Sequence, residues 1–355
     1  MPDCIAQFHA IAAMAHGTPE GASQPPIGLF TSQKRDDWAR MREQLLKLDK
    51  TNADSFHEIE NTLFCVCLDD SSPANDQEMS QLSFIGNGHN RYYDRNFQMI
   101  SFANGQTCVN SEHTWADALI VSDLFDHINE TADELMKRTF EASKSLPEEL
   151  LPKRLSWVMS ATTGEGLERA KEHYVRLRDS IDMCAYKFNA FGKTAISKSF
   201  GLSPDAFIQM AMQLAHLRLH RKVVLTYESS HTRRFWHGRT EAVRSASSQS
   251  TAFAKAMDAL SADDRDTKKY LLQQACEAHV NTIKHNMAGQ GFDRHLLMLK
   301  VVSITQKLPL PELYRDKVLF SLCPPHTHPH HSFSRFGTPH SVLFQSCFFV
   351  AGLDA

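Results

Sequence analysis

The spacing of apolar side chains predicts helices and short strands in the first third of the chain. Residues 34–47, KRDDWARMREQLLK, place their apolar side chains on one face of a helix, and residues 52–63 indicate a second helix. The apolar run FCVCL, residues 64–68, is short enough for a buried strand. A polar loop is expected over residues 69–79.

A β-hairpin is predicted next. Residues 97–102 and 107–110 have the character of two strands, and Asn104-Gly105 lies between them. Asn-Gly is a strong hairpin signal because both residues tolerate the left-handed backbone of a tight turn. The second strand leads directly into Glu112 and His113, so the hairpin holds these side chains at a strand end.

Helical patterns dominate the rest of the chain. Ser203, Pro204 and Asp205 form a helix start, with serine as N-cap, proline at the first helical position and an acid in the first turn. A strand is predicted over residues 223–227. Further helices are predicted over residues 129–143, 165–183, 265–287 and 296–304.

Composition narrows the class of protein. The net charge is −3 and the isoelectric point is about 6.7, which argues against a nucleic-acid partner. No apolar run reaches 18 residues, so no transmembrane segment is expected, and no targeting signal is visible. The eight cysteines are scattered without a C-x-x-C pair, as in a reduced intracellular protein without a zinc site.

Shifts in composition suggest the domain organisation. Residues 1–30 show no clear period and are expected to be a poorly ordered leader. Leu151-Pro152 and residues 162–166 mark a junction, so we place one domain over residues 31–155 and a second over 156–322. Residues 323–355 form an atypical tail rich in histidine and proline. The histidine spacing in this tail permits metal binding, but we expect no metal site because no acidic or cysteine ligand accompanies it.

The strongest candidate for chemistry is His113. It follows a predicted strand and has a carboxylate on each side, Glu112 and Asp117. A neutral imidazole is the natural general base at neutral pH. By position alone, however, one histidine among 19 is more often structural. Asp117 lies four residues after His113, where it either orients the imidazole or only begins a helix.

Several motifs in the same order resemble those of choline/carnitine acyltransferases. Residues 86–118 contain NRYYDR, the hairpin and then EHTWAD, which is similar to the catalytic region of that family. The resemblance covers roughly residues 29–322. It resumes in FGK at 191–193, SPDAFIQMAMQLAHLRLH at 203–220, TYESSHTRRFWHGRTEAVRSAS at 226–247 and GQGFDRHLLMLK at 289–300.

This resemblance implies a two-domain α/β fold, the coenzyme A-dependent acyltransferase fold, with mixed sheets covered by helices. The active site is then expected in a tunnel between the domains. The implied function is carnitine O-acyltransfer: reversible movement of a fatty acyl group between coenzyme A and carnitine. Acyl-CoA and carnitine are the expected partners, and coenzyme A is a co-substrate rather than a permanently bound cofactor.

The resemblance also implies roles for particular residues. His113 is the expected base, with Asp117 beside it. Lys193 and Lys198 are expected to bind the 3′-phosphate of coenzyme A, although the loop is one residue longer than the family's FGKxxxK pattern. Asp205 matches a residue at the start of the coenzyme A-binding helix. The expected carnitine-binding residues are Tyr227, Ser229, Thr240 and Arg294.

Arg294 favours carnitine over choline because a guanidinium binds a carboxylate, which choline lacks. Trp115 and Asp117 look most like the carnitine palmitoyltransferase branch, which suggests medium- or long-chain acyl groups and a mitochondrial location. Relative to that branch the chain lacks two membrane helices, the start of the N-terminal half and a Ser-Thr-Ser segment after Leu322. The alternative is therefore a catalytically inactive, truncated isoform that binds coenzyme A weakly or not at all.

Overall fold

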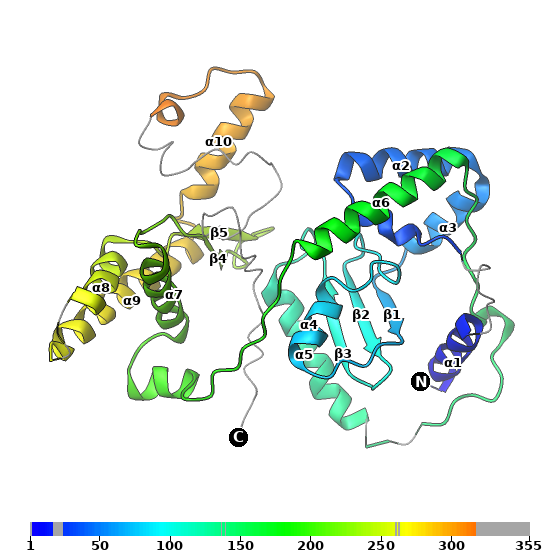
Figure 1. Cartoon of the computed structure of the whole chain (residues 1–355), viewed down its shortest axis with the longest axis horizontal. Coiled ribbons are helices and arrows are strands. Elements are labelled where there is room, and N and C mark those ends of the chain that lie inside the picture. The colour runs from blue at the N-terminus through cyan, green and yellow to red at the C-terminus, as the bar shows by residue number, and fades with distance from the viewer. Residues whose placement is uncertain are drawn as a thin grey trace. The chain divides into compact units, whose positions relative to one another are not determined.

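The computed structural model describes residues 2–16, 24–135, 137–138, 140–259, 261 and 263–316. The chain divides into two compact units, residues 1–185 and residues 186–355 (Figure 1). Both units combine helices with a small sheet, so the described chain is mixed α/β and mostly helical. No helix among these residues has the length and apolar character needed to cross a bilayer.

The first unit contains a three-stranded sheet and the helices around it. Its elements are α1 (Pro2–His16), η1 (Ile27–Ser32), α2 (Arg35–Leu48), α3 (Lys50–Glu60), β1 (Cys65–Asp69), α4 (Asp76–Phe84), β2 (Phe97–Phe102), β3 (Thr107–Ser111), α5 (Ala118–Leu135), η2 (Glu148–Leu150) and α6 (Ala161–Asp179).

The sheet confirms the predicted hairpin. β2 pairs antiparallel with β3, Phe97 opposite Ser111, and β1 joins the other edge of β2 in parallel. Gly105 in the connection has φ +81°, a conformation that glycine adopts without strain. Ile100 and Phe102 are buried on the inner face of β2, so the hydrophobic effect fixes the register and thereby the point at which β3 ends.

Helices α2, α3 and α6 pack together near one end of the sheet (Figure 1). A row of rings runs through this layer: Phe30 lies 6.1 Å from Trp38, Trp38 5.9 Å from Phe56, and Phe56 4.8 Å from Trp157. Such aromatic contacts add to the free energy gained from apolar burial. They fix the helical layer to which the sheet is attached.

Two features of this unit differ from the predicted organisation. The leader is not without structure, because α1 is helical and Ile27 and Phe30 of η1 are buried in the core. Residues 162–166 are not a linker. They lie within α6, whose N-cap Ser160 forms a capping box with Thr163. The compact units divide after residue 185 rather than near 155, since α6 packs against η1 and α2; the extents of the family domains remain a prediction.

The second unit is a small helical bundle with a two-stranded hairpin. Its core contains Ala206 and Met210 from α7, Phe253 from α8 and Ala275 from α9. Its elements are η3 (Ala195–Ser199), α7 (Pro204–His220), β4 (Glu228–His231), β5 (Thr240–Val243), α8 (Ser248–Ala259), α9 (Arg265–Met287), α10 (Asp293–Thr305) and η4 (Glu312–Arg315).

The sequence-based prediction missed some helices and strands and misplaced others. The predicted loop 69–79 contains the start of α4, and α8 was not predicted at all. The helix expected over 129–143 is α5, which begins at Ala118 because the apolar face around Val121 starts earlier. The strand expected over 223–227 lies instead at β4, directly after it. The predicted tail, residues 323–355, lies outside the described residues.

Candidate active site

The loop that follows β3 holds His113. The Glu112 N–H and the indole N–H of Trp115 both donate to the carbonyl oxygen of Asn96, at 3.0 and 2.7 Å. The indole ring also lies 6.3 Å from the ring of Phe97 on β2. Because the residues on both sides of His113 are anchored to the start of β2, the sheet determines where this histidine is presented.

His113 projects toward solvent beside the Asp117 carboxylate. Its side chain is 66% exposed, and its Nδ1 lies 3.5 Å from Oδ1 of Asp117. Residues 113–117 form a bend rather than a helical turn, and α5 begins only at Ala118. The bend nevertheless brings the two side chains together. A carboxylate at Nδ1 favours the tautomer that carries its proton there, which makes Nε2 the basic nitrogen.

The NRYYDR segment, by contrast, is structural. Arg91 is 3% exposed and binds Asp69 at the end of β1 through two hydrogen bonds of 2.8 Å. Asn90 donates to the carbonyl oxygen of Leu68 at 2.9 Å. The burial of this ion pair is compensated by its bidentate geometry, so the segment fixes the edge of the sheet.

Three of the predicted carnitine-binding residues lie in or beside the β4–β5 hairpin. Ser229 pairs with Ala242, and His231 pairs with Thr240. Directly paired residues, and residues two apart in a strand, project to the same side of a sheet. Ser229 and Thr240 are therefore on one face, and Tyr227 directly precedes β4.

Gly238 closes this hairpin. The Thr232 N–H donates to the carbonyl oxygen of Arg239 at 2.8 Å, and a Cβ atom on Gly238 would lie 2.0 Å from the carbonyl oxygen of Thr232. No side chain fits in that space. The glycine therefore allows the chain to return so that Thr240 enters β5 opposite His231.

Arg294 joins the same group from α10. Its guanidinium donates to the Tyr227 hydroxyl at 2.8 Å and lies 5.5 Å from the centre of that ring. The preceding residue, Asp293, accepts a 2.9 Å hydrogen bond from Arg244, just after β5. This ion pair ties the first turn of α10 to the hairpin, so that the cation next to it reaches Tyr227. Arg244 and Asp293 were not singled out in the sequence, although both lie in its motifs.

Lys193 lies just before a π-helical turn, and Lys198 lies within it. η3 is a π-helix, and the Phe200 N–H donates to the carbonyl oxygen of Ala195, five residues earlier, at 3.0 Å. A π turn accommodates one residue more than an α turn. The additional residue between Lys193 and Lys198 is thus absorbed in the turn, and two positions five apart lie about one turn from each other. Both side chains are exposed.

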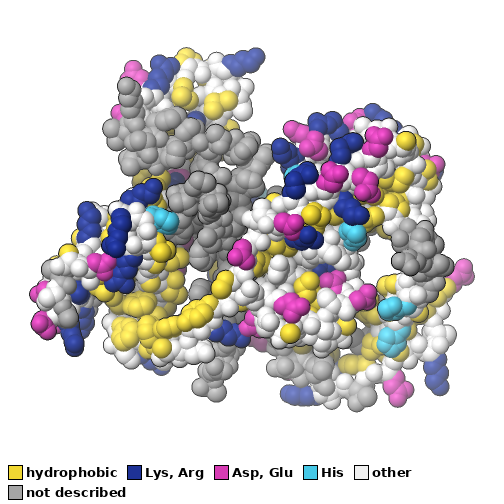
Figure 2. Space-filling view, viewed as in Figure 1, with side chains coloured by type: hydrophobic (Ala, Val, Ile, Leu, Met, Phe, Trp, Pro, Cys, Tyr) yellow, Lys and Arg dark blue, Asp and Glu magenta, His cyan; other side chains and the backbone are white. Residues whose placement is uncertain are grey.

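An aromatic cluster supports this turn. Phe191 lies 5.8 Å from Phe200 and 6.0 Å from Phe207, which belongs to α7. Figure 2 shows hydrophobic side chains gathered at the surface in this part of the second unit. The rings attach η3 to α7, so the lysines are held near the start of the helix that carries Asp205.

Asp205 meets two groups that sequence reasoning missed. Nε2 of His279 on α9 lies 3.4 Å from Oδ2 of Asp205 and 3.1 Å from Oε2 of Glu228 on β4. The His279 side chain is 1% exposed. One signal was present in the sequence: His279 lies four and three residues after Ala275 and Cys276, on the apolar stripe of the predicted helix.

The electrostatics of this cluster follow from burial and charge. The contact with His279 lowers the pKa of Asp205, whereas burial raises the pKa of Glu228. Burial opposes charge on His279, but its two carboxylate neighbours outweigh that effect and raise its pKa to about 9. His279 is therefore charged at neutral pH.

The same three groups are the described residues that could hold a metal ion. One ligand atom from each of Asp205, Glu228 and His279 lies within 4.8 Å of the others. Two carboxylate oxygens and one imidazole nitrogen suit a divalent transition metal only when the imidazole has lost its proton. The raised pKa of His279 works against that state.

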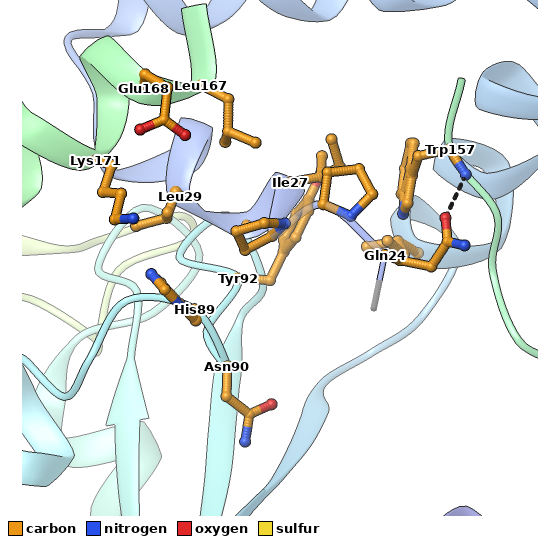
Figure 3. Close-up of a pocket in the computed structure, with 14 residues that line it drawn as sticks. Gln24, Ile27, Leu29, His89, Asn90, Tyr92, Trp157, Leu167, Glu168 and Lys171 are labelled. Carbon is orange, nitrogen blue, oxygen red and sulfur yellow. Dashed lines mark hydrogen bonds between the residues drawn. The ribbon is translucent and has the colours of Figure 1, made fainter. Parts of the chain in front are cut away.

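A pocket in the first unit contains none of the predicted site residues. Its volume is about 540 Å³, and its walls come from η1, the loop around His89, the segment at Trp157 and helix α6. Figure 3 shows Lys171 and His89 on either side of Leu29, and the Trp157 N–H bonded to Gln24 at 3.0 Å. The charged residues of its wall, Glu168 and Lys171, are exposed.

Comparisons with known proteins agree with the motif resemblance. A family model described as Choline/Carnitine o-acyltransferase matches residues 2–349. Peroxisomal carnitine O-octanoyltransferase of Homo sapiens is 34% identical over 324 residues, which cover 90% of this chain and 52% of that protein. Choline O-acetyltransferase of Homo sapiens is 35% identical over 323 residues, 89% and 42% of the two chains. Carnitine O-acetyltransferase of Homo sapiens is 34% identical over 304 residues, 83% and 47%.

The chain therefore belongs to the choline/carnitine O-acyltransferase family, a family of acyltransferase enzymes. It spans about half the length of the curated relatives it matches. The family match includes both the predicted leader and most of the predicted tail. The relatives' names include two acceptors, carnitine and choline, and two acyl groups, octanoyl and acetyl. The acceptor must therefore be argued from this chain's own residues.

Proposed function

We propose that this chain contributes the base and both substrate-binding regions for acyl transfer between coenzyme A and carnitine. The observation that carries the proposal is the group formed by Tyr227, Ser229, Thr240 and Arg294. It combines a cation with hydroxyl groups on one hairpin face, which suits a small molecule that bears both a carboxylate and a hydroxyl. Choline has no group for Arg294 to neutralise.

The reaction then needs no covalent enzyme intermediate. Nε2 of His113 takes the proton of the carnitine hydroxyl as its oxygen attacks the thioester carbonyl. The tetrahedral intermediate expels coenzyme A as a thiolate, and the imidazolium returns the proton to that sulfur. Asp117 contacts Nδ1 and keeps the ring in the tautomer that exposes Nε2 as the base.

The coenzyme A side of the proposal rests on the turn at η3. Lys193 and Lys198 supply two exposed cations about one turn apart, which suits a phosphate monoester such as the 3′-phosphate. Asp205 begins the next helix and presents a half-exposed carboxylate as a hydrogen-bond acceptor for the cofactor. The tunnel between domains remains a prediction.

The substitution Arg294→Gln tests whether carnitine is the acyl acceptor. It removes the cation but keeps a side chain of similar length. We expect the KM for carnitine to rise about thirtyfold or more, since loss of one partner of a buried charge pair costs roughly 2–5 kcal/mol. The KM for acyl-CoA should change little. Arg265→Gln, at the exposed start of α9, is the matched control. An increase in the acyl-CoA KM instead would contradict the carboxylate assignment.

The acyl group and the cellular compartment are two further parts of the proposal. The acyl group is a fatty acyl chain, and the compartment is an organelle: we expected a mitochondrion, whereas the octanoyltransferase of Homo sapiens is named as peroxisomal. Kinetics with acetyl-, octanoyl- and palmitoyl-CoA test the first, and imaging of the tagged chain tests the second. A preference for acetyl-CoA or a diffuse cytosolic signal would contradict them.

A further inference from the structure

The buried imidazole of His279 has no part in the acyl transfer described above. Yet its Nε2 lies 3.4 and 3.1 Å from two carboxylate oxygens, and neither ring nitrogen makes a hydrogen bond of ordinary geometry to the described residues. Burying a charged group is costly unless opposite charges surround it. A position this costly calls for a function that an apolar residue could not provide.

The cation of His279 reduces the electrostatic repulsion that two carboxylates would exert on bound coenzyme A. Coenzyme A carries several phosphate charges, so two ionised carboxylates beside it would repel it. A cation between the carboxylates removes much of that repulsion and leaves their outer oxygens as acceptors for N–H or O–H groups. Asp205 is suited to this because its side chain remains 53% exposed, whereas Glu228 is 18% exposed.

We infer that His279, in its charged form, is a positioning residue for coenzyme A: it holds Asp205 and Glu228 together and cancels part of their charge, so that Asp205 accepts a hydrogen bond from the cofactor. This inference rests on the proposed function, in which Asp205 faces coenzyme A. The three groups come from α7, β4 and α9, and they are the charged groups that the described residues bring against this imidazole.

Glu228 also links the two substrate regions. Its carboxylate contacts His279, whereas the hydroxyl of the preceding residue, Tyr227, contacts Arg294. Ser245, just after β5, places its hydroxyl 3.5 Å from the Glu228 carboxylate. The carboxylate that contacts the imidazole and the hydroxyl that contacts Arg294 therefore belong to adjacent residues.

A bound divalent cation is the competing occupant of this cluster. It would require His279 without its proton at Nε2, because metal ligands must be deprotonated. The structure favours the proton instead: burial raises the pKa of Glu228, and the two carboxylates raise that of His279. A metal would have to displace this proton, so Zn²⁺ titration distinguishes the two occupants.

Calorimetric titration of coenzyme A into the full chain tests the inference without requiring catalysis. In His279→Gln, the Kd for coenzyme A should rise roughly tenfold, because two carboxylates lose their counter-charge, while carnitine binding changes much less. Adding Glu228→Gln to that variant should recover most of the affinity. In the unaltered chain, affinity should fall as the pH approaches 9, and in His279→Gln this fall should be absent.

The control is His216→Gln, which alters a buried histidine of the same unit that contacts the Lys222 carbonyl oxygen at 3.1 Å rather than a carboxylate. It should leave the coenzyme A Kd unchanged. An unchanged Kd in folded His279→Gln, or no recovery on adding Glu228→Gln, would overturn the inference. So would tight Zn²⁺ binding that His279→Gln abolishes. If the unaltered chain binds no coenzyme A, the proposed function itself fails, and the inference falls with it.

Discussion

His113 and His279 are the same side chain in opposite surroundings. His113 stands on a loop of the first unit, 66% exposed, with one carboxylate 3.5 Å from Nδ1. His279 lies inside the second unit, 1% exposed, with two carboxylates within 3.4 Å of Nε2. The first can exchange protons with a bound substrate. The second is surrounded by groups that keep its proton in place.

The comparison shows that acidic neighbours, rather than burial alone, decide which form a histidine holds. His216 is also buried, and there burial lowers the pKa. His279 is more deeply buried, yet its pKa is raised to about 9. A general base must lose and regain a proton during each turnover, so only a site like that of His113 suits this role.

The largest effect should come from His113→Ala. Loss of a general base typically lowers the rate about 10²–10⁴-fold, and we expect acyl transfer to fall by that factor while coenzyme A binding is retained. His127→Ala, an exposed histidine on α5, is the matched control and should leave the rate unchanged. Turnover of the His113 variant near that of the control would remove His113 from the mechanism.

The next largest effect concerns the stability of the second unit. Removing one partner of a buried ion pair typically costs about 3–5 kcal/mol, so His279→Gln should lower the free energy of unfolding by that amount. The control His216→Gln should cost less, because it leaves no carboxylate without its partner. Denaturant titrations of both variants measure the difference. Equal losses would show that the ion pairs contribute nothing.

The pH dependence of stability sharpens the same comparison. Because the folded pKa of His279 is raised from its ordinary 6.5 to about 9, its contribution is fully present below pH 6.5 and is lost as the pH rises through about 9. The raised pKa of Glu228 acts in the same direction, and the lowered pKa of Asp205 acts only in acid. The Tm should therefore fall between pH 6.5 and 9. A flat Tm would contradict a charged His279.

The smallest effect is expected at the lysines. Both side chains are exposed, so solvent and salt screen them, and each is worth roughly 0.2–1 kcal/mol. Lys193→Ala and Lys198→Ala should each raise the KM for acyl-CoA a few-fold. Neither substitution should change the KM for an acyl-CoA analogue that lacks the 3′-phosphate. Lys269→Ala, on the exposed side of α9, is the control. An equal loss with the analogue would place the lysines elsewhere on the cofactor.

Local sequence signals predicted the elements whose cause is local. The apolar stripe of α2, the N-cap of α7 and the Asn-Gly turn before β3 were all confirmed, because each depends on residues close in sequence. The β4–β5 hairpin was harder to predict from the sequence. Its four-residue strands carry no alternating pattern, and an extended segment becomes a strand only where a partner strand pairs with it.

The contacts of the candidate site also divide into local ones, which the sequence predicted, and long-range ones, which it did not. His113 and Asp117 are four residues apart, and their contact could be anticipated from the sequence. The contact between Asp205 and His279, and the tie from Arg244 to Asp293, join residues that are far apart in the chain. Packing of α9 and α10 against the hairpin brings them together, and no local pattern encodes that.

One measurement tests the central claim most directly: the chain is mixed with octanoyl-CoA and L-carnitine, and both products are followed with time. We predict that coenzyme A thiol and octanoylcarnitine appear in equal amounts and only when carnitine is present. Thiol release without octanoylcarnitine would indicate hydrolysis. No release by a folded chain that binds both substrates would contradict the account and favour the inactive isoform.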